Sequence, residues 1–250
     1  MHLCIYEADR PTPEDQARFG SYADMFERWL APALPQARFS RVLVAGGEAP
    51  PDPGAVDAVL ITGSRAGVHD GDPWIADLKA HVVALRAAGV PMGGICFGHQ
   101  LLAEAFGGRV NRAPAGWTIG RHLHAVQPAG QALFGATPLA ALSFHQDQVI
   151  DAPPSATGIL SSPASPNGGL RYDFPALSVQ VHPELDSAYV RGLLTGTAVT
   201  VFPKPLVKTS LATLGLPLDA AALAKGFARF YLASMESASE NLKDIGKPNG

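Results

Sequence analysis

The stretch GVPMGGICFGHQLLAEAFGG, Gly89–Gly108, joins a short apolar segment to a helical pattern without an intervening loop. Residues 90–95 predict a buried strand, and residues 98–108 predict a helix that ends at paired glycines. At such a junction the side chain of the turn residue is lifted above the sheet edge, and its neighbours must be small. Three glycines leave that room: Gly93, Gly94 and Gly98. The pattern predicts a nucleophile elbow with Cys96 as nucleophile; the alternative is a cysteine of the core.

Two electrostatic features of the elbow favour a reactive sulfur. A helix N-terminus stabilises negative charge, so the thiolate of Cys96 is favoured there. The amide of Phe97, the next residue, faces the position where an oxyanion would form. Cys4 lies inside an apolar strand pattern without glycines, and we interpret it as a packing residue.

Apolar strands alternate with helical patterns in the first part of the chain. Strands are predicted at 3–8, 39–45, 57–64 and 90–95, and helices at 14–34, 73–89 and 98–108. This order is typical of an α/β fold with a mostly parallel sheet and helices on both faces. Short strands after residue 108 predict antiparallel additions, and a helical C-terminal tail follows. We therefore expect one domain over 1–185 and a helical extension over 186–250 that packs on it.

Composition restricts the class of protein. The chain has 250 residues, of which 47% are hydrophobic and 16% charged, with a formal net charge of −3, so neither nucleic acid nor a membrane surface is an expected partner. No stretch of about 18 residues is apolar enough to span a bilayer. The N-terminus has no basic segment before an apolar core, so we expect no signal peptide. The sequence contains two cysteines, so we do not expect a disulfide framework. We expect a cytoplasmic location instead.

A base for the sulfur is predicted in the segment LSVQVHPEL. His182 follows an apolar strand, and Glu184 lies two positions later, which places both side chains on one face of an extended backbone. The carboxylate can then bind one imidazole nitrogen and leave the other for the sulfur of Cys96. Taken alone, an H-P-E segment is more typical of a surface turn; paired with the elbow cysteine and placed after a strand, it favours a base.

The motifs GICFGHQ and QVHPE, in that order, resemble the class I glutamine amidotransferase family over Leu3 to about Leu185. The resemblance implies a flavodoxin-like fold. It also implies a Cys-His-Glu triad that hydrolyses the γ-carboxamide of glutamine, with Cys96 as nucleophile, His182 as base and Glu184 as orienting acid. Neither a cofactor nor a metal is implied.

The resemblance also implies roles for residues outside the triad. The turn Thr62-Gly63-Ser64 matches the glycine turn whose amide, at Gly63, completes the oxyanion hole. Gln100 resembles the residue that helps to hold the amino-acid head of the substrate. The segment FHQDQV is similar to the family segment that lines the glutamine site, which makes His145, Gln146 and Asp147 candidate substrate contacts.

Several other residues have a structural interpretation beside a functional one. His122 and His124 alternate on one strand and could begin a metal site, but no third ligand is recognisable, and a polar strand face is the preferred interpretation. His99 is expected to pack or cap near the elbow, and Glu104 to lie on a solvated or salt-bridged helix face. Tyr172 is a candidate for shaping the pocket.

Three functions stay open at this point. The first is a stand-alone cysteine hydrolase that acts on glutamine or on a γ-glutamyl amide or peptide through a γ-glutamyl thioester. The second is a glutaminase subunit that delivers ammonia to a separate synthetase partner. The third is a non-catalytic binding protein. The sequence leaves the identity of the substrate and the oligomeric state open.

Overall fold

The computed structural model describes residues 1–196 and 200–245, with side chains as far as residue 237. A mixed sheet forms its centre, with the strand order β2-β1-β3-β4-β11-β10-β9-β6-β7. The first five of these strands run parallel: β2 (Arg38–Val42), β1 (His2–Tyr6), β3 (Ala58–Ile61), β4 (Met92–Ile95) and β11 (Ala176–Val179). The predicted α/β fold with a parallel sheet is therefore confirmed.

The parallel strands are covered on both faces, as predicted. On one face lie α2 (Tyr22–Leu30), α5 (Gln131–Phe134) and α8 (Ala220–Ile245), and on the other α3 (Pro73–Ala87) and α4 (Phe97–Ala105). Alternate residues of β1 serve the two faces, since Leu3 and Ile5 pack with α2 and α8, whereas Cys4 and Tyr6 pack with α3. This burial on both faces explains why the strands are continuous apolar runs.

The second half of the sheet is antiparallel, as expected for the chain after residue 108. Its strands are β10 (Gly169–Tyr172), β9 (Ala156–Ser161), β6 (Thr118–Val126) and β7 (Leu139–His145). A separate antiparallel pair consists of β5 (Arg109–Arg112) and β8 (Asp147–Asp151). Short 3-10 turns lie at Val44–Gly46, Pro53–Ala55 and Pro128–Gly130.

The single helix predicted over 14–34 is wrong, because the structure contains two. Helix α1 (Pro13–Phe19) ends at Gly20, whose φ of 86° lies in the region that favours glycine. Helix α2 then starts anew at Ser21, which forms a capping box with Asp24. The apolar spacing continues across the break, which is why periodicity alone merged the two helices.

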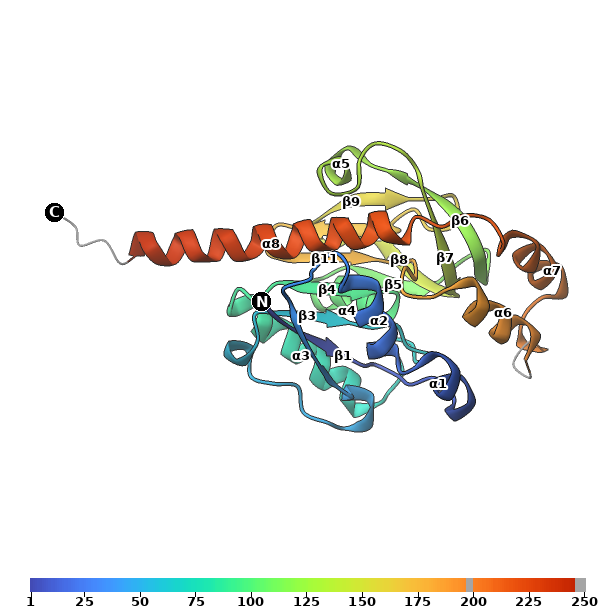
Figure 1. Cartoon of the computed structure of the whole chain (residues 1–250), viewed down its shortest axis with the longest axis horizontal. Helices are drawn as coiled ribbons and strands as arrows, with labels where there is room; N and C mark the ends of the chain where they lie inside the picture. Colours follow the sequence, from blue (N-terminus) through green and yellow to red (C-terminus); the bar gives the residue numbers. More distant parts are fainter. Residues whose placement is uncertain (197–199, 246–250) are drawn as a thin grey trace.

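The helical tail is confirmed as α6 (Ser187–Thr195), α7 (Lys204–Thr213) and α8. Figure 1 shows α8 running across the sheet and projecting beyond the rest of the molecule at its C-terminal end. Tyr231 of α8 donates a hydrogen bond to the Val59 carbonyl of β3 at 2.9 Å. The division of the chain at residue 185 stays a prediction, and residues 197–199 and 246–250 lie outside the described part.

The docking of α8 revises the interpretation of one glycine. A Cβ at Gly93 would collide with the hydroxyl of Tyr231 and lie 2.7 Å from Leu60. Gly93 therefore makes room for the tail helix, and the room around the elbow comes from Gly94 and Gly98.

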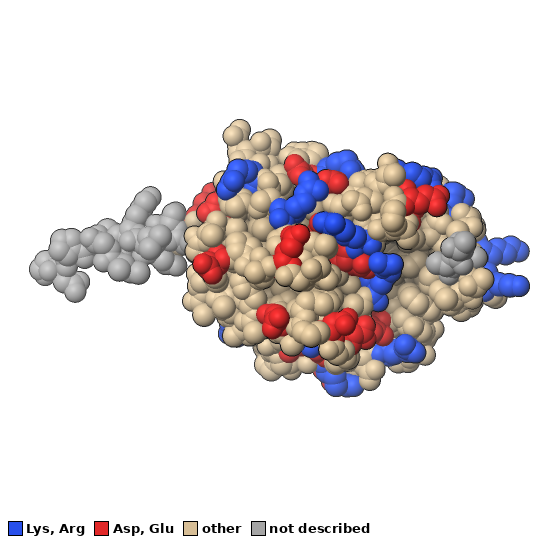
Figure 2. Space-filling model, turned by 90° about the horizontal axis from the view of Figure 1, so that it is seen from below, with Lys and Arg blue, Asp and Glu red and all other residues tan. Residues whose placement is uncertain are grey.

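The face of the molecule in Figure 2 has no large region of a single charge. Acidic and basic side chains are mixed over this face, and some are paired, such as Arg65 with Asp9 at 2.7 Å. Among the described residues, no helix is long and apolar enough to cross a membrane.

Candidate functional site

Cys96 occupies the junction between β4 and α4 in a strained backbone conformation. Its φ of 50° and ψ of −100° make it the one non-glycine residue with positive φ in the described part of the chain. Such a conformation costs on the order of 1–3 kcal/mol, and strain of this kind clusters at functional sites. A Cβ at Gly94 would lie 2.6 Å from the Gly98 carbonyl, and one at Gly98 would collide with the Ile61 carbonyl. The sequence thus permits this tight turn only because both neighbours lack a side chain.

Two backbone amides lie beside the sulfur-bearing residue. The N–H of Phe97 belongs to the first turn of α4, where amides have no partner within the helix. Gly63 follows β3, and a Cβ built on it would lie 3.6 Å from the Cβ of Cys96. Among the hydrogen bonds of the described residues, none uses the Gly63 N–H. The structure therefore places Gly63 beside Cys96, whose next neighbour in the chain is Phe97.

His182 and Glu184 lie directly after β11, the neighbour of β4 in the sheet. The Nδ1 atom of His182 and Oε1 of Glu184 are 2.7 Å apart. The backbone N–H of His182 donates to the Leu142 carbonyl of β7 at 2.8 Å, which fixes this segment against the antiparallel half of the sheet. The structure therefore unites Cys96, His182 and Glu184, although they are distant in the sequence.

The charge environment of His182 couples it to both neighbours. Burial by itself would lower the pKa of His182, but the nearby Cys96 and the hydrogen-bonded Glu184 hold this pKa well above its ordinary value. A raised pKa means that the imidazolium is favoured between a sulfur and a carboxylate.

Gln180 is a polar neighbour of the sulfur and is not among the site residues predicted from the sequence. Its Nε2 donates to Sγ of Cys96 at 3.4 Å, and its side chain is almost completely buried. A signal existed, since Gln180, His182 and Glu184 alternate along one segment and so share a face.

Some of the predicted substrate contacts have buried side chains, and others have side chains that are partly exposed. The Nε2 of Gln100 donates to the Asp147 carbonyl at 2.8 Å and to Oε1 of Gln180 at 3.1 Å, so this amide is used inside the protein. His145 is also buried, with Nδ1 3.1 Å from the Asp147 carbonyl. The Asp147 side chain is 33% exposed, and its Oδ2 would lie 3.4 Å from a Cβ at Gly67, in the loop after β3.

The fourth candidate, Gln146, is half-buried and contributes its backbone carbonyl to a 2.7 Å hydrogen bond from Ala113. No side-chain hydrogen bond of Gln146 occurs among the described residues. Its placement at the β7–β8 turn puts it next to Asp147, so its role in substrate binding stays a prediction.

The structure assigns a packing role to His99, as expected. Its Nδ1 lies 2.8 Å from Oγ of Ser178, and its Nε2 lies 3.0 Å from the Asn167 carbonyl. Because a carbonyl only accepts, Nε2 carries the proton and Ser178 donates to Nδ1. Burial lowers the pKa of His99 to about 4, so the ring is neutral.

The polar strand face expected for His122 and His124 is wrong for His124, which is buried. The loop before β10 covers it, since a Cβ at Gly168 would lie 3.4 Å from its Nδ1. Burial lowers the pKa of His124 to about 4. Among the described residues, no group of three or more His, Cys, Asp or Glu side chains could hold a metal ion.

Glu104 and Tyr172 both make contacts that stabilise the fold. Glu104 forms ion pairs with Lys79 at 2.6 Å and with His69 at 2.9 Å, which confirms a salt-bridged helix face. Tyr172 packs in the core against Phe106 and Phe174, with ring centroids 6.0 and 5.1 Å apart. Its position in this aromatic cluster gives it a packing role.

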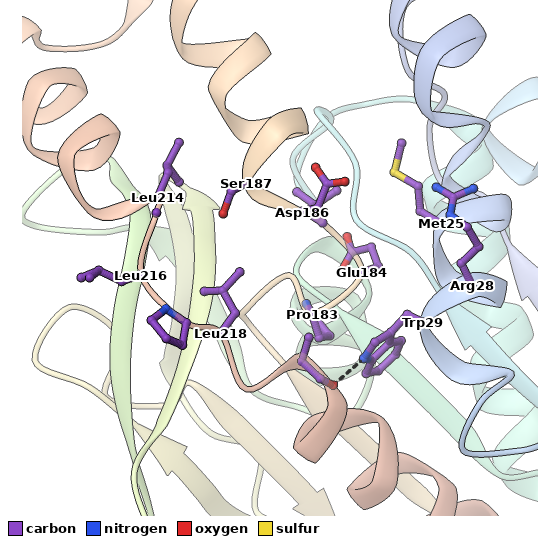
Figure 3. A pocket seen from close by; sticks show the side chains of 14 residues that line it. Met25, Arg28, Trp29, Pro183, Glu184, Asp186, Ser187, Leu214, Leu216 and Leu218 are labelled. Atoms are coloured by element: carbon purple, nitrogen blue, oxygen red, sulfur yellow. Dashed lines mark hydrogen bonds between the residues drawn. The ribbon is translucent and has the colours of Figure 1, made fainter.

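Glu184 also lines a hollow of about 610 Å³ at the surface. Figure 3 shows Leu214, Leu216 and Leu218 on one side of it and residues of α2, including Trp29, on the other. The indole of Trp29 donates to the carbonyl of Ala220 at 2.8 Å and so joins α2 to the start of α8. Cys96 is not among the residues that line this hollow, whereas Glu184 is.

Known proteins resemble the chain in sequence. A glutamine amidotransferase-like protein of Schizosaccharomyces pombe is 28% identical over 247 residues, which cover 92% of this chain and 98% of the relative. Gamma-glutamyl peptidase 5 of Arabidopsis thaliana is 32% identical over 176 residues, or 66% of this chain and 68% of the relative. A glutamine-hydrolyzing GMP synthase of Listeria monocytogenes is 30% identical over 147 residues, or 57% of this chain and 27% of the synthase.

The fold is similar to that of a crystallised glutamine amidotransferase from Thermotoga maritima. The TM-score is 0.72 at 20% identity, and the match covers 94% of this chain and 98% of the other. The profile of the family described as glutamine amidotransferase class-I matches residues 50–190, which include the elbow and the segment of His182 and Glu184. The chain belongs to the class-I glutamine amidotransferase family.

Proposed function

We propose that the protein is a cysteine-dependent hydrolase that cleaves the γ-carboxamide of glutamine or of a γ-glutamyl amide or peptide. The observation that carries the proposal is the strained Cys96, which accepts a hydrogen bond from Gln180 and lies beside His182, with Glu184 2.7 Å from the imidazole. Similarity to a γ-glutamyl peptidase over two thirds of that protein supports this substrate class.

In the proposed reaction, the thiolate of Cys96 attacks the γ-carbonyl carbon of the substrate. The carbonyl oxygen becomes an oxyanion, which accepts hydrogen bonds from the amides of Gly63 and Phe97. As the carbon–nitrogen bond breaks, the imidazolium of His182 gives its proton to the leaving amine or ammonia. The product of this half-reaction is a γ-glutamyl thioester on Cys96.

Water completes the cycle. Neutral His182 takes a proton from a water molecule, whose oxygen attacks the thioester carbonyl. The carbon–sulfur bond then breaks, glutamate leaves, and the thiolate–imidazolium pair is restored. Glu184 keeps Nδ1 of the imidazole engaged throughout, so that the other ring nitrogen serves the reacting atoms.

For the amino-acid head of the substrate, we propose the Asp147 carboxylate as partner of the α-amino group. It is partly exposed, and its ion pair with Arg112 is long, at 4.0 Å. Gln146 lies beside it, whereas Gln100 and His145 hold the backbone of Asp147 from inside.

A glutaminase subunit that supplies a separate synthetase is the second candidate. It is favoured by the similarity to a GMP synthase, of which this chain matches only 27%. In this case the reaction at Cys96 is the same, but the ammonia is consumed by the partner. The assay below separates the two candidates.

The test is release of glutamate by the pure protein from L-glutamine and from γ-glutamyl dipeptides. The hydrolase proposal predicts release without a partner, its loss in Cys96→Ala, and its retention in Cys4→Ala. Absence of release, with Cys96 still labelled by an electrophilic glutamine analogue, would favour the subunit. Full activity of Cys96→Ala would refute both candidates.

A further inference from the structure

A chain of amide groups connects the Asp147 carbonyl to the sulfur of Cys96. The Nε2 of Gln100 donates to the Asp147 carbonyl at 2.8 Å and to Oε1 of Gln180 at 3.1 Å. The Nε2 of Gln180 in turn donates to Sγ of Cys96 at 3.4 Å. We call this chain from Asp147 through Gln100 and Gln180 the amide relay. Both glutamine side chains are buried, so water does not replace these partners.

The direction of each amide in the relay follows from its first member. Oxygen and nitrogen of a glutamine amide are interchangeable in shape, so the orientation must be derived from partners. The Asp147 carbonyl can only accept, which requires Gln100 to turn its NH2 group toward it. That NH2 group also faces Gln180, which must therefore present its oxygen. The remaining end of Gln180, its NH2 group, is thereby aimed at the sulfur.

The same carbonyl is fixed from a second side by His145. Burial and the nearby His182 lower the pKa of His145 to about 3, so the ring is neutral. Its Nδ1 donates to the Asp147 carbonyl at 3.1 Å, and its Nε2 accepts from the Ser165 hydroxyl at 3.2 Å. A carbonyl has two lone pairs and can accept both bonds. The first member of the relay is thus held in place independently of Gln100.

We propose that Gln180 is a positioning residue that stabilises the thiolate of Cys96, and that Gln100 acts on the sulfur through Gln180. An N–H directed at sulfur favours the thiolate, which accepts hydrogen bonds more strongly than the thiol. The inference deepens the proposed function and rests on it, because the same sulfur is the proposed nucleophile. It also changes the role expected for Gln100 from contact with the substrate to support of the nucleophile.

The test measures alkylation of Cys96 by iodoacetamide across pH, with Cys4 replaced by alanine in all proteins. Iodoacetamide has no amino-acid head, so a residue that binds only the substrate does not affect its rate. A hydrogen bond to a charged group contributes about 1.5–3 kcal/mol in proteins. The lower limit of this range corresponds to a change of roughly tenfold in rate. Gln180→Met is therefore expected to be alkylated about tenfold more slowly at pH 7 and to recover at higher pH.

Two further variants sharpen the comparison. Gln180→Glu keeps the side-chain length and the acceptor for Gln100 but presents an oxygen to the sulfur, so its rate at pH 7 should fall further. Gln100→Met leaves Gln180 intact and should slow alkylation by a smaller factor. The control is Gln148→Met, because Gln148 is buried and its Oε1 has no hydrogen-bond partner within the described structure. This control should match the parent protein.

Unchanged alkylation profiles in folded Gln180 and Gln100 variants would overturn the inference. A raised KM for a γ-glutamyl substrate in Gln100→Met, with alkylation unchanged, would also overturn it and return Gln100 to a substrate contact. If the Gln180 variants do not fold, Gln100→Met decides alone. The proposed function fails separately if the parent protein releases no glutamate while these alkylation shifts are still observed.

Discussion

Gly63 packs so closely against His182 that alanine in its place should disturb the site more than the fold. A Cβ at position 63 would lie 2.8 Å from Cε1 of His182 and 3.6 Å from Cβ of Cys96, where ordinary contacts begin at 3.4 Å. The difference between 3.4 and 2.8 means that the ring or the turn must move by about 0.6 Å. Either movement separates the imidazole from the sulfur or displaces the Gly63 amide.

The cost of this shift is larger in catalysis than in stability. A misplacement of about 1 Å at a reacting group can reduce the rate on the order of 10²-fold. For Gly63→Ala we therefore expect kcat/KM to fall roughly tenfold to a hundredfold. Overpacking a tight contact costs about 1–3 kcal/mol, so the variant should still fold and unfold at a moderately lower temperature.

The assay is glutamate release from a γ-glutamyl dipeptide, with thermal unfolding measured in parallel. The matched control is Gly71→Ala, because Gly71 lies in the loop after the same turn and a Cβ there would meet nothing within 4 Å. The control should retain both activity and stability. Full activity of a folded Gly63→Ala variant would refute the close packing of Gly63 on the His182 imidazole, the proposed base.

Three other experiments, two with variants and one with the parent protein, test separate parts of the structure. Because Glu184 and Cys96 raise the pKa of His182, Glu184→Gln should lower this pKa and move the alkaline limb of the pH profile of kcat/KM to lower pH. An alkaline limb at the same pH would contradict the effect of Glu184 on the imidazole. Tyr231→Phe removes the buried hydrogen bond from α8 to β3 and should lower the free energy of unfolding by about 0.5–1.5 kcal/mol in urea titration, whereas no loss would contradict that bond. Burial raises the pKa of the Cys4 thiol, so iodoacetamide should label Cys96 before Cys4, as peptide mapping would detect; equal rates would count against a thiolate at position 96.

The sequence was most informative where one residue type serves one geometric need. The elbow could be predicted because only glycine fits at Gly94 and Gly98, where backbone atoms approach closely. The pairing of His182 with Glu184 followed from strand alternation and agrees with their separation of 2.7 Å. In these cases a local pattern dictates the local geometry.

It was less informative where the reason for a residue lies in a distant segment. Gly93 belongs to the same glycine cluster, but the atoms that require it are those of Tyr231 on the tail helix. The burial of His124 depends on a loop that returns to β6 from further along the chain. The buried link between Gln100 and Gln180 joins two motifs that were each recognisable, but their contact depends on how β4 and β11 pair.

The break between α1 and α2 could have been found without the structure. Gly20 is followed by Ser21 and, three positions later, by Asp24, which is a capping-box pattern. The apolar periodicity of 14–34 continues across this signal and does not mark the break. The cap marks it, because capping groups satisfy amides that the helix itself leaves unpaired.

Mass spectrometry can test whether Cys96 forms a covalent γ-glutamyl intermediate beside His182. The protein is mixed with a γ-glutamyl substrate, quenched in acid within the first turnover, and digested. We expect a γ-glutamyl group attached to the peptide that contains Cys96 and absent from Cys96→Ala. Turnover with the acyl group on another residue, or on none, would contradict it.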